Sequence, residues 1–254
     1  CSSSGIIFTS LTLTPKEFSH VASVLVLISL VLPDSTSLPI IIIPAIISFL
    51  FDIYKYKLNI MKFTNTLIKG KLIKRYKRFF ADIKVNNSTV IAHCPNTGSM
   101  LGLLDKNNEA WISKADDPNR KLKFTLEIIN SKKLLIGVNT HRANRIVEHA
   151  LRNRLIQEFK SIKNIKPEFK FSKDTRFDFL CDNKILEVKN VTFTREKGLA
   201  EFPDAVTSRG SKHLVKLIDS MRKNYVPYVL FLTQIQGINN FRIAKDIDDN
   251  YFQN

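Results

Sequence analysis

The sequence predicts a two-domain protein of mixed α+β and α/β class, with an OB-like small β-barrel followed by an α/β domain. Three observations predict this fold class. Residues 61–139 contain short strand-like segments separated by turn residues, and residues 140–254 alternate helical and strand patterns. The composition also changes sharply at Met61, after a strongly apolar stretch. We therefore expect domains at 61–139 and 140–254, preceded by an N-terminal extension at 1–60.

The first domain is predicted from its short strands and the turns between them. Asn86-Asn87, Pro95–Gly98 and Asp116–Asn119 are turn sequences. Five or six short strands over about 80 residues are typical of a small barrel, and the OB fold is the natural candidate. The expected strands lie at 66–76, 79–85, 88–94, 109–115, 124–130 and 132–139.

The second domain begins with apolar residues at helical spacing, for which Asn139 or Thr140 is a suitable N-cap. Helices then alternate with strands, which indicates an α/β arrangement, and we place the domain boundary near residue 140. The expected order is a helix at 140–160, a strand hairpin at 176–190, a helix at 208–224 and a buried strand at 225–235.

The N-terminal extension differs from the rest of the chain. Its apolar runs at 21–32 and 38–51 are shorter than the roughly 18 to 20 residues of a spanning helix, and three prolines lie in or next to them. No basic segment precedes the first run, as a signal peptide would require. We interpret 1–60 as upstream translation or a gene-model artefact, non-native or disordered, with Met61 as the natural start. The rival interpretation is a genuine membrane anchor around 38–54.

The charge of the chain points to a polyanionic partner. The formal net charge is +16, and the acidic and basic residues of 1–60 cancel, so the whole excess lies on 61–254. A protein this basic usually binds nucleic acid or an anionic membrane surface. Cys1, Cys94 and Cys181 form no disulfide or zinc spacing, which fits a reducing, cytoplasmic location. The sequence has no glycine-rich phosphate loop or G-x-S-x-G elbow, so kinase, NTPase and hydrolase interpretations lack support.

The hairpin RFDFLCDNKILEVKN brings two acids and a lysine together. A two-residue turn at Asp182-Asn183 gives cross-strand partners whose numbers add to 365, which sets Asp178 opposite Glu187. Lys189 lies two residues beyond Glu187 and projects from the same face. The opposite face is expected to carry the apolar neighbours Phe177, Phe179, Leu186 and Val188.

Two explanations of this charge cluster remain open from spacing alone. Directly opposed carboxylates destabilise a strand pair unless a cation compensates, and Mg²⁺ accepts such oxygens while keeping waters and binding phosphates. Lys189 would then position or activate the attacking water, or neutralise charge on the phosphate. Alternatively, Lys189 or Arg176 simply forms an ion pair with the two acids on an exposed strand face.

Five longer stretches together carry a resemblance to a known family. Through them, residues 61–254 resemble the sugar fermentation stimulation protein family, whereas 1–60 do not. The resemblance implies an OB-like domain followed by a PD-(D/E)xK nuclease-like domain, in a protein described as DNA-binding and often labelled a DNA/RNA nuclease. The stretches are RYKRFFADI (75–83), HCPNTGSM (93–100), GVNTHRANRIVEHAL (137–151), FDFL with LEVKNVTF (177–193) and FPDAVTSRGSKHL (202–214).

The resemblance implies a particular set of site residues. Asp178, Glu187 and Lys189 match the nuclease motif, and Glu148 on the preceding helix matches the acidic position that completes such a site. For Glu148 the alternative is a solvated helix charge. Asp178, Glu187 and Glu148 would bind Mg²⁺ or Mn²⁺, and DNA or RNA would be the partner, with no small-molecule cofactor.

The same resemblance leaves a second function open and raises a question about the C-terminal end. A DNA-binding regulatory protein that affects sugar metabolism, with an idle site on the same fold, is the alternative to a nuclease. The family pattern continues into another helix and strand after the strand at 225–235. Truncation of the C-terminal domain is therefore also among the expectations.

The stretch RYKRFF interleaves basic and aromatic side chains. Arg75, Lys77 and Arg78 suit nucleic-acid binding, because charge holds the phosphate backbone while aromatic rings stack on bases. Strand alternation favours a place in the barrel core, rather than on a stacking platform, for Phe79 or Phe80.

A second basic group lies near the start of the helix at 208–224. Arg209, Lys212 and His213 are expected to contact phosphates or the carboxylates around the site, the alternative being a solvated basic face. Asp204 is interpreted as a turn or cap residue. We interpret 93–100 as a structural turn at the domain interface.

Overall fold

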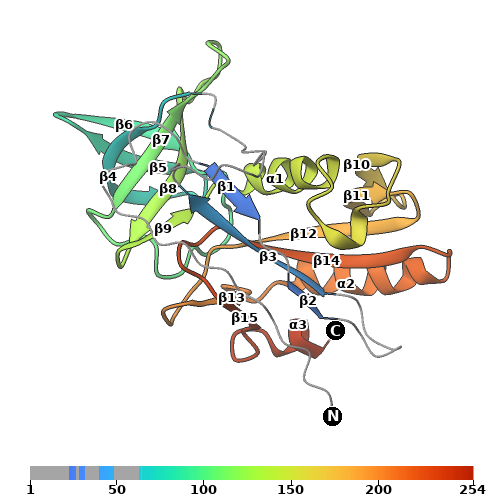
Figure 1. The fold of residues 1–254 in the computed structure, drawn as a ribbon. Coiled ribbons are helices and arrows are strands. Elements are labelled where there is room, and N and C mark those ends of the chain that lie inside the picture. The colour runs from blue at the N-terminus through green and yellow to red at the C-terminus, as the bar shows by residue number, and fades with distance from the viewer. Residues whose placement is uncertain (1–22, 27–28, 32–39, 49–62, 64, 254) are drawn as a thin grey trace, which may run out of the picture.

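The computed structural model describes residues 23–26, 29–31, 40–48, 63 and 65–253. It consists of a small barrel beside a mixed sheet that has a helix on each face (Figure 1). Among the described residues, no helix is both long enough and apolar enough to span a membrane.

The barrel is a closed five-stranded OB-type barrel, as the sequence predicts. Its strand order is β6-β5-β4-β7-β8, and a parallel pairing between β6 and β8 closes it, while β9 extends the sheet beyond β8. The strands are β4 (Ile68–Tyr76), β5 (Phe80–Val85), β6 (Ser88–His93), β7 (Glu109–Lys114), β8 (Phe124–Ser131) and β9 (Leu134–Gly137).

Strand alternation fills the barrel, since side chains two apart share a face. Ala81 and Ile83 on β5 are fully buried, and Ile83 is the cross-strand partner of the buried Leu72 on β4. The predicted turn at Asn86-Asn87 joins β5 to β6, with Asn86 at φ 51°, a backbone conformation that asparagine tolerates better than most residues.

The expectation of a core aromatic at 79–80 is wrong. Phe79 is 48% exposed, and Phe80 lies half-buried against Tyr76, with the two rings stacked at 5.4 Å. The reason is the tight turn at Lys77 and Arg78, both at positive φ, after which the inward positions of β5 begin at Ala81. Aromatic surface is therefore presented beside the basic turn.

The second domain is built on a mixed sheet of order β1-β3-β14-β12-β11-β10, with β2 paired to β3. Helix α1 covers one face and helix α2 the other (Figure 1). The predicted order of helix, two strands, helix and strand is confirmed as α1, β11, β12, α2 and β14. Their bounds are α1 (Thr140–Arg152), β11 (Arg176–Cys181), β12 (Lys184–Val191), α2 (Ser208–Met221) and β14 (Val226–Thr233).

The first helix is shorter than expected. It starts at the predicted N-cap Asn139, whose side chain accepts from the N–H of His141, but ends at Arg152 instead of residue 160. The chain then turns back through a 3₁₀ helix at Gln157–Phe159, which buries Phe159 completely. Phe159 is therefore not on α1, but it packs in the same apolar core as that helix.

Four elements of the second domain were not predicted. The edge strand β10 (Ile165–Lys170) carries charges and Pro167, so its sequence does not read as a strand. It pairs with β11 in one continuous register, in which Glu168, at φ 52°, is not paired. The others are β13 (Leu199–Phe202), β15 (Asn240–Ile243) and α3 (Asp249–Gln253), of which β13 and β15 pair with each other in parallel.

Three strands are described within 1–60: β1 (Ser23–Val26), β2 (Ser29–Val31) and β3 (Ile40–Ser48). β3 runs parallel to β14, with Ile40 beside Val229. Most of 1–60 lies outside the described residues, and so does Met61, the proposed start. The interpretation of this extension therefore stays a prediction.

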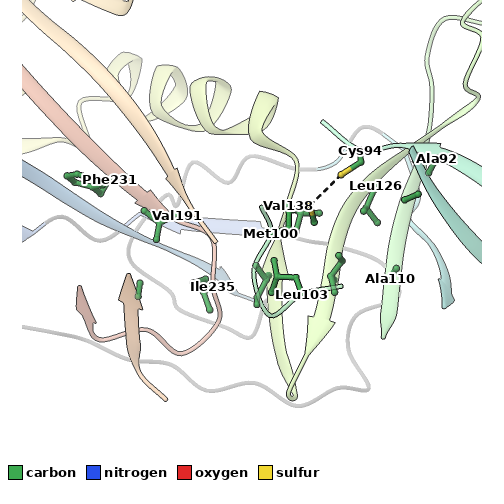
Figure 2. Packing of buried hydrophobic residues seen from close by; sticks show 14 of the residues in the cluster. Ala92, Cys94, Met100, Leu103, Ala110, Leu126, Val138, Val191, Phe231 and Ile235 are labelled. Atoms are coloured by element: carbon green, nitrogen blue, oxygen red, sulfur yellow. Dashed lines mark hydrogen bonds between the residues drawn. The ribbon is translucent and has the colours of Figure 1, made fainter. Parts of the chain in front are cut away.

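The two domains share one continuous apolar core (Figure 2). Cys94, Met100 and Val138 of the barrel side belong to the same cluster as Phe231 and Ile235 of the sheet. Backbone hydrogen bonds also cross the junction, from Gly137 N–H to the Gln234 carbonyl at 2.8 Å and from Gln236 N–H to the Leu135 carbonyl at 2.9 Å. The junction therefore holds the barrel in a fixed position beside the sheet.

The loop at 93–100 lies at this junction, as predicted. Asp204 accepts a hydrogen bond from the N–H of Met100 at 2.9 Å, and its carbonyl accepts one from the Ser99 hydroxyl at 2.9 Å. Thr140 donates to the Pro95 carbonyl at 3.1 Å. Asp204 is thus a structural residue that fastens the loop to the second domain.

Candidate functional site

The β11–β12 hairpin has the predicted turn and register. Phe179 pairs with Leu186 and Cys181 with Lys184, and Asp182 takes the positive φ of 53° that the tight turn requires. The ladder ends at Phe179 and Leu186. Beyond it, the carboxylate of Asp178 accepts the N–H of Val188 at 2.6 Å. The direct opposition of Asp178 and Glu187 that we expected is replaced by this bond from side chain to backbone.

The two strands separate at the site because β11 changes the face on which it packs. Phe179 belongs to the core under α1, whereas Phe177 belongs to the core on the α2 side, where its ring lies 6.2 Å from that of His213. The expectation that both phenylalanines share one face is therefore wrong. The separation leaves room between the strands, and the acidic side chains lie at that point.

Glu187 is a buried carboxylate with two basic partners. It is 5% exposed, and its Oε1 accepts from the Lys189 ammonium at 2.6 Å and lies 2.7 Å from His213 Nδ1. Burial alone would raise the pKa of Glu187, but Lys189 and then His213 outweigh it and lower the pKa below its ordinary value. Glu187 is therefore a permanent negative charge in the site at neutral pH.

Asp178 lies on the α1 side of the same site. Its second oxygen accepts from the Asn144 amide at 2.7 Å. Burial, and then the charge of Glu187, raise the pKa of Asp178 to about 6, although the hydrogen bonds from Val188 and Asn144 oppose the shift. The two acids thus have opposite pKa shifts, as is frequent where carboxylates share a functional site.

A pocket of about 360 Å³, which we call the carboxylate pocket, contains the predicted triad. Asp178, Glu187 and Lys189 line it together with His213 and Arg209. The structure therefore brings the three motif residues together with two members of the predicted basic group.

Two larger depressions adjoin the carboxylate pocket. The junction cleft, about 620 Å³, shares Lys189 and Thr207 with it and reaches Arg75 and Arg78 of the barrel. The α2 groove, about 1060 Å³, shares Arg209 with it. This groove is strongly basic, since only Asp174 among its lining residues is acidic, against Lys170, Lys173, Arg176, Arg209, Lys212 and Lys216.

The predicted basic residues fall into different structural settings. Arg75 donates to the carbonyls of Arg78, Asn96 and Gly98 at 2.8–3.0 Å, so it holds the loop at the junction. Lys77 and Arg78 are exposed in the β4–β5 turn. Arg209 and Lys212 are exposed along α2, whereas His213 turns inward to Glu187.

Glu148 is the predicted site residue that the structure does not bring to the pocket. Its carboxylate accepts from Arg152 at 2.6 and 2.9 Å, one helical turn further along α1. Asn144, one turn earlier, is the α1 residue that contacts Asp178. The metal-ligand role of Glu148 stays a prediction.

Sequence reasoning missed Asn144 and the segment that supports α2. Asn144 lies four residues before Glu148 and therefore on the same side of the helix, a spacing that could have indicated it. Asp248 accepts the N–H of Thr207 at 2.7 Å, and Thr207 caps α2 through the N–H of Gly210. No local pattern indicates this support, because it joins residues 41 apart in the chain.

The residues present fit a magnesium-type site. Among the described residues, no group of three or more His, Cys, Asp and Glu side chains forms a metal-binding cluster. Mg²⁺ does not require one, since it is held by one or two carboxylates together with waters and substrate phosphates. Both basic partners of Glu187 use Oε1, and the pKa of Asp178 is raised by burial and then by repulsion from Glu187. A cation between the two acids would relieve that repulsion.

Comparisons with known sequences match both domains. The model of the SfsA N-terminal OB domain matches residues 73–138, and that of the sugar fermentation stimulation protein RE domain matches residues 141–254. A sugar fermentation stimulation protein homolog from Pelagibacter ubique is 61% identical over 198 residues, which cover 76% of this chain and 85% of that protein. One from Brucella anthropi is 42% identical over 197 residues, covering 75% and 85%.

A comparison with solved structures agrees on the fold. The structure of Pyrococcus furiosus SfsA in complex with Ca²⁺ aligns with a TM-score of 0.69, at 20% identity, over 76% of this chain and 83% of that one. At this identity the likeness concerns the fold alone.

Proposed function

Because this chain belongs to the sugar fermentation stimulation protein family, we propose that it is a cytoplasmic nucleic-acid-binding protein with a metal-dependent phosphodiesterase site. The observation that carries the proposal is the convergence of Asp178, Glu187 and Lys189 on one pocket. The basic α2 groove beside that pocket suits a polyanionic substrate. Cys94 and Cys181 are free thiols, which suits a reducing compartment.

The residues of the pocket have distinct roles in this proposal. Asp178 and Glu187 are the carboxylates that would hold Mg²⁺ or Mn²⁺, which would polarise the phosphate and a bound water. Lys189 orients the attacking water or stabilises the charge that develops on the phosphate oxygens. Asn144 and His213 fix the orientations of Asp178 and Glu187 through their hydrogen bonds. The related P. furiosus protein was solved with Ca²⁺, a cation of the same oxygen-binding class.

A cleavage assay with matched variants tests the proposal. Single- and double-stranded DNA and RNA are incubated with the protein, with Mg²⁺ or Mn²⁺ and with chelator. We expect metal-dependent cleavage that Glu187→Gln and Lys189→Ala each reduce by roughly 100-fold or more, whereas Asp105→Asn, at an exposed loop position of the barrel, leaves it unchanged. Cleavage that survives both substitutions, or none on any substrate, would refute the phosphodiesterase.

The second candidate function is a DNA-binding regulatory protein whose site is idle. The observation that favours it is the ion-pair network of Glu187 with Lys189 and His213, which already compensates the buried charge without a metal. This function predicts steeply salt-dependent binding with no cleavage under any metal condition.

A further inference from the structure

Helix α1 borders a second basic depression on a face other than the one it turns to the junction cleft. Thr140 and Asn144 line the junction cleft, whereas His141 and Arg145 line a separate pocket of about 400 Å³. We call it the arginine–histidine pocket, after His93, Arg120, His141, Arg142 and Arg145, which come from the end of β6, the β7–β8 loop and α1. It lies outside the site described above.

The base of this pocket is a fixed structure. Glu127 is only 3% exposed and accepts from the Ser113 hydroxyl at 2.7 Å and the Asn139 amide at 2.9 Å. Arg142 binds both of its carboxylate oxygens, at 2.6 and 3.0 Å, and stacks over the ring of Phe63 at 4.0 Å. Glu127 and Arg142 therefore neutralise each other, and Glu127 is not available to balance the other cations.

The remaining charge in the pocket is positive. Once Glu127 and Arg142 are paired, the cations Lys114, Arg120 and Arg145 face the single acid Asp116. The imidazole rings of His93 and His141 lie beside these cations and offer further N–H groups, with ring centres 6.2 Å apart. Burial, and then Arg120 and His141, lower the pKa of His93, as expected where like charges face one another.

We propose that the arginine–histidine pocket binds a phosphate group, either a phosphodiester of a nucleic-acid strand or a terminal phosphomonoester. Guanidinium and imidazole N–H groups are the donors that suit tetrahedral oxyanions, and an anion would compensate the unbalanced cations. Arg120 is already oriented by its bond to the Thr125 hydroxyl at 2.8 Å.

Imidazole resonances of the whole protein test occupancy directly. His93 and His141 are assigned by His93→Gln and His141→Gln, and sodium phosphate is titrated against sodium chloride at equal ionic strength. We expect phosphate to shift both resonances and chloride to leave them in place. Arg120→Gln/Arg145→Gln should abolish the shifts, whereas Lys160→Gln/Arg222→Gln, which removes the same charge elsewhere, should retain them. Resonances that do not move, or move equally with chloride, would overturn the proposal.

Binding of a 12-nucleotide single strand in the presence of chelator identifies the source of the phosphate. Arg120→Gln/Arg145→Gln should weaken binding of the strand roughly tenfold relative to Lys160→Gln/Arg222→Gln. A tenfold change corresponds to the loss of about one charge-assisted hydrogen bond. A loss confined to the 5′-phosphorylated strand assigns a terminal phosphomonoester, and an equal loss with a 5′-hydroxyl assigns an internal phosphodiester. Equal affinities of the two double variants would overturn the proposal. Chelator prevents metal-dependent cleavage, so the result is independent of the carboxylate pocket.

Discussion

Glu187 keeps its negative charge in a place from which water is almost excluded. Lys189 and His213 make this possible, since both bond to the same carboxylate oxygen. A buried acid whose counter-ion is removed leaves an uncompensated charge, which is far more costly than losing an exposed ion pair. The same contacts that hold the site together therefore contribute to the stability of the folded protein.

The pairing predicts that Lys189→Met destabilises the protein by about 3 kcal/mol, because Glu187 loses its ammonium partner while remaining buried. Chemical denaturation at pH 7 measures the loss. Glu187→Gln/Lys189→Met should recover most of it, and Lys71→Met, at an exposed position of the barrel, should change stability little. A loss equal in both lysine variants would contradict the role of the buried pair.

The raised pKa of Asp178 predicts that its contribution to folding stability falls as the pH rises. An ordinary ion-paired acid, whose pKa is lowered, has the opposite dependence. The pKa of Asp178 is raised from the usual 3.8 to about 6, so between these values the folded protein holds a proton that the unfolded chain has released. This contribution to stability is full below about pH 4 and is lost as the pH rises through 6. Wild type should lose up to about 3 kcal/mol relative to Asp178→Asn between pH 4 and 7.

Unfolding free energies of both proteins across that range measure the effect, and Mg²⁺ provides a second test. It should stabilise wild type at pH 7 more than at pH 5, because it binds the ionised acid. A difference between the two proteins that does not vary with pH would contradict the raised pKa.

At the scale of elements, the sequence predicts most strands and helices because local pattern controls them. The barrel strands, the hairpin register and the Asn139 cap follow from alternation, turn residues and helical spacing. Strand β10 escapes prediction because Pro167 and its charges suit only an edge position, which is a property of the sheet rather than of the segment. The separation of β11 from β12 is likewise not predictable from the segment, because it depends on tertiary packing. Phe177 packs on the α2 side of the sheet, whereas Phe179 packs under α1.

The candidate site is predictable only where it is local. Asp178, Glu187 and Lys189 lie within twelve residues of one another, so hairpin geometry and the family resemblance together identify them. Asn144 and His213 come from two helices on opposite faces of the sheet. Their contacts depend on how those helices pack, which a strand pattern does not contain.

The β4–β5 turn gives a prediction that separates structure from binding. Arg75 donates to three backbone carbonyls, whereas Arg78 is exposed. We expect Arg75→Ala to destabilise the protein by about 2 kcal/mol, because the carbonyls of the junction loop lose their donor. Arg78→Ala should leave stability unchanged and weaken nucleic-acid binding. Urea denaturation and binding anisotropy on both variants measure this, and equal stability losses would contradict the assignment.

At the scale of the whole molecule, the domains are held as one unit by a shared core and by the loop at 93–100. Leu72 of the barrel and Phe231 of the sheet belong to one apolar cluster. The junction cleft lies along this boundary and is lined by the loop that Asp204 fastens. Stability of the junction and geometry of the candidate site are therefore coupled.

Asp204→Ala tests that coupling. The N–H of Met100 loses its acceptor, so we expect a local cost of about 1–3 kcal/mol and faster hydrogen exchange at residues 98–101. Asp105→Ala, at an exposed loop position, is the matched control. Exchange rates measured by mass spectrometry should rise in the first variant only. An unchanged loop in Asp204→Ala would show that the apolar core alone fixes the junction.

The edge strand β10 has a consequence for how the protein behaves at high concentration. A flat, exposed strand edge is a template on which further copies can add, and so a route to filaments. Here Pro167 offers no N–H to an incoming strand, and Glu168 at positive φ interrupts the regular spacing of hydrogen-bonding groups. Lys166 and Lys170 add electrostatic repulsion between copies. The irregularity that hides this strand from sequence prediction thus protects the protein from aggregation through that edge.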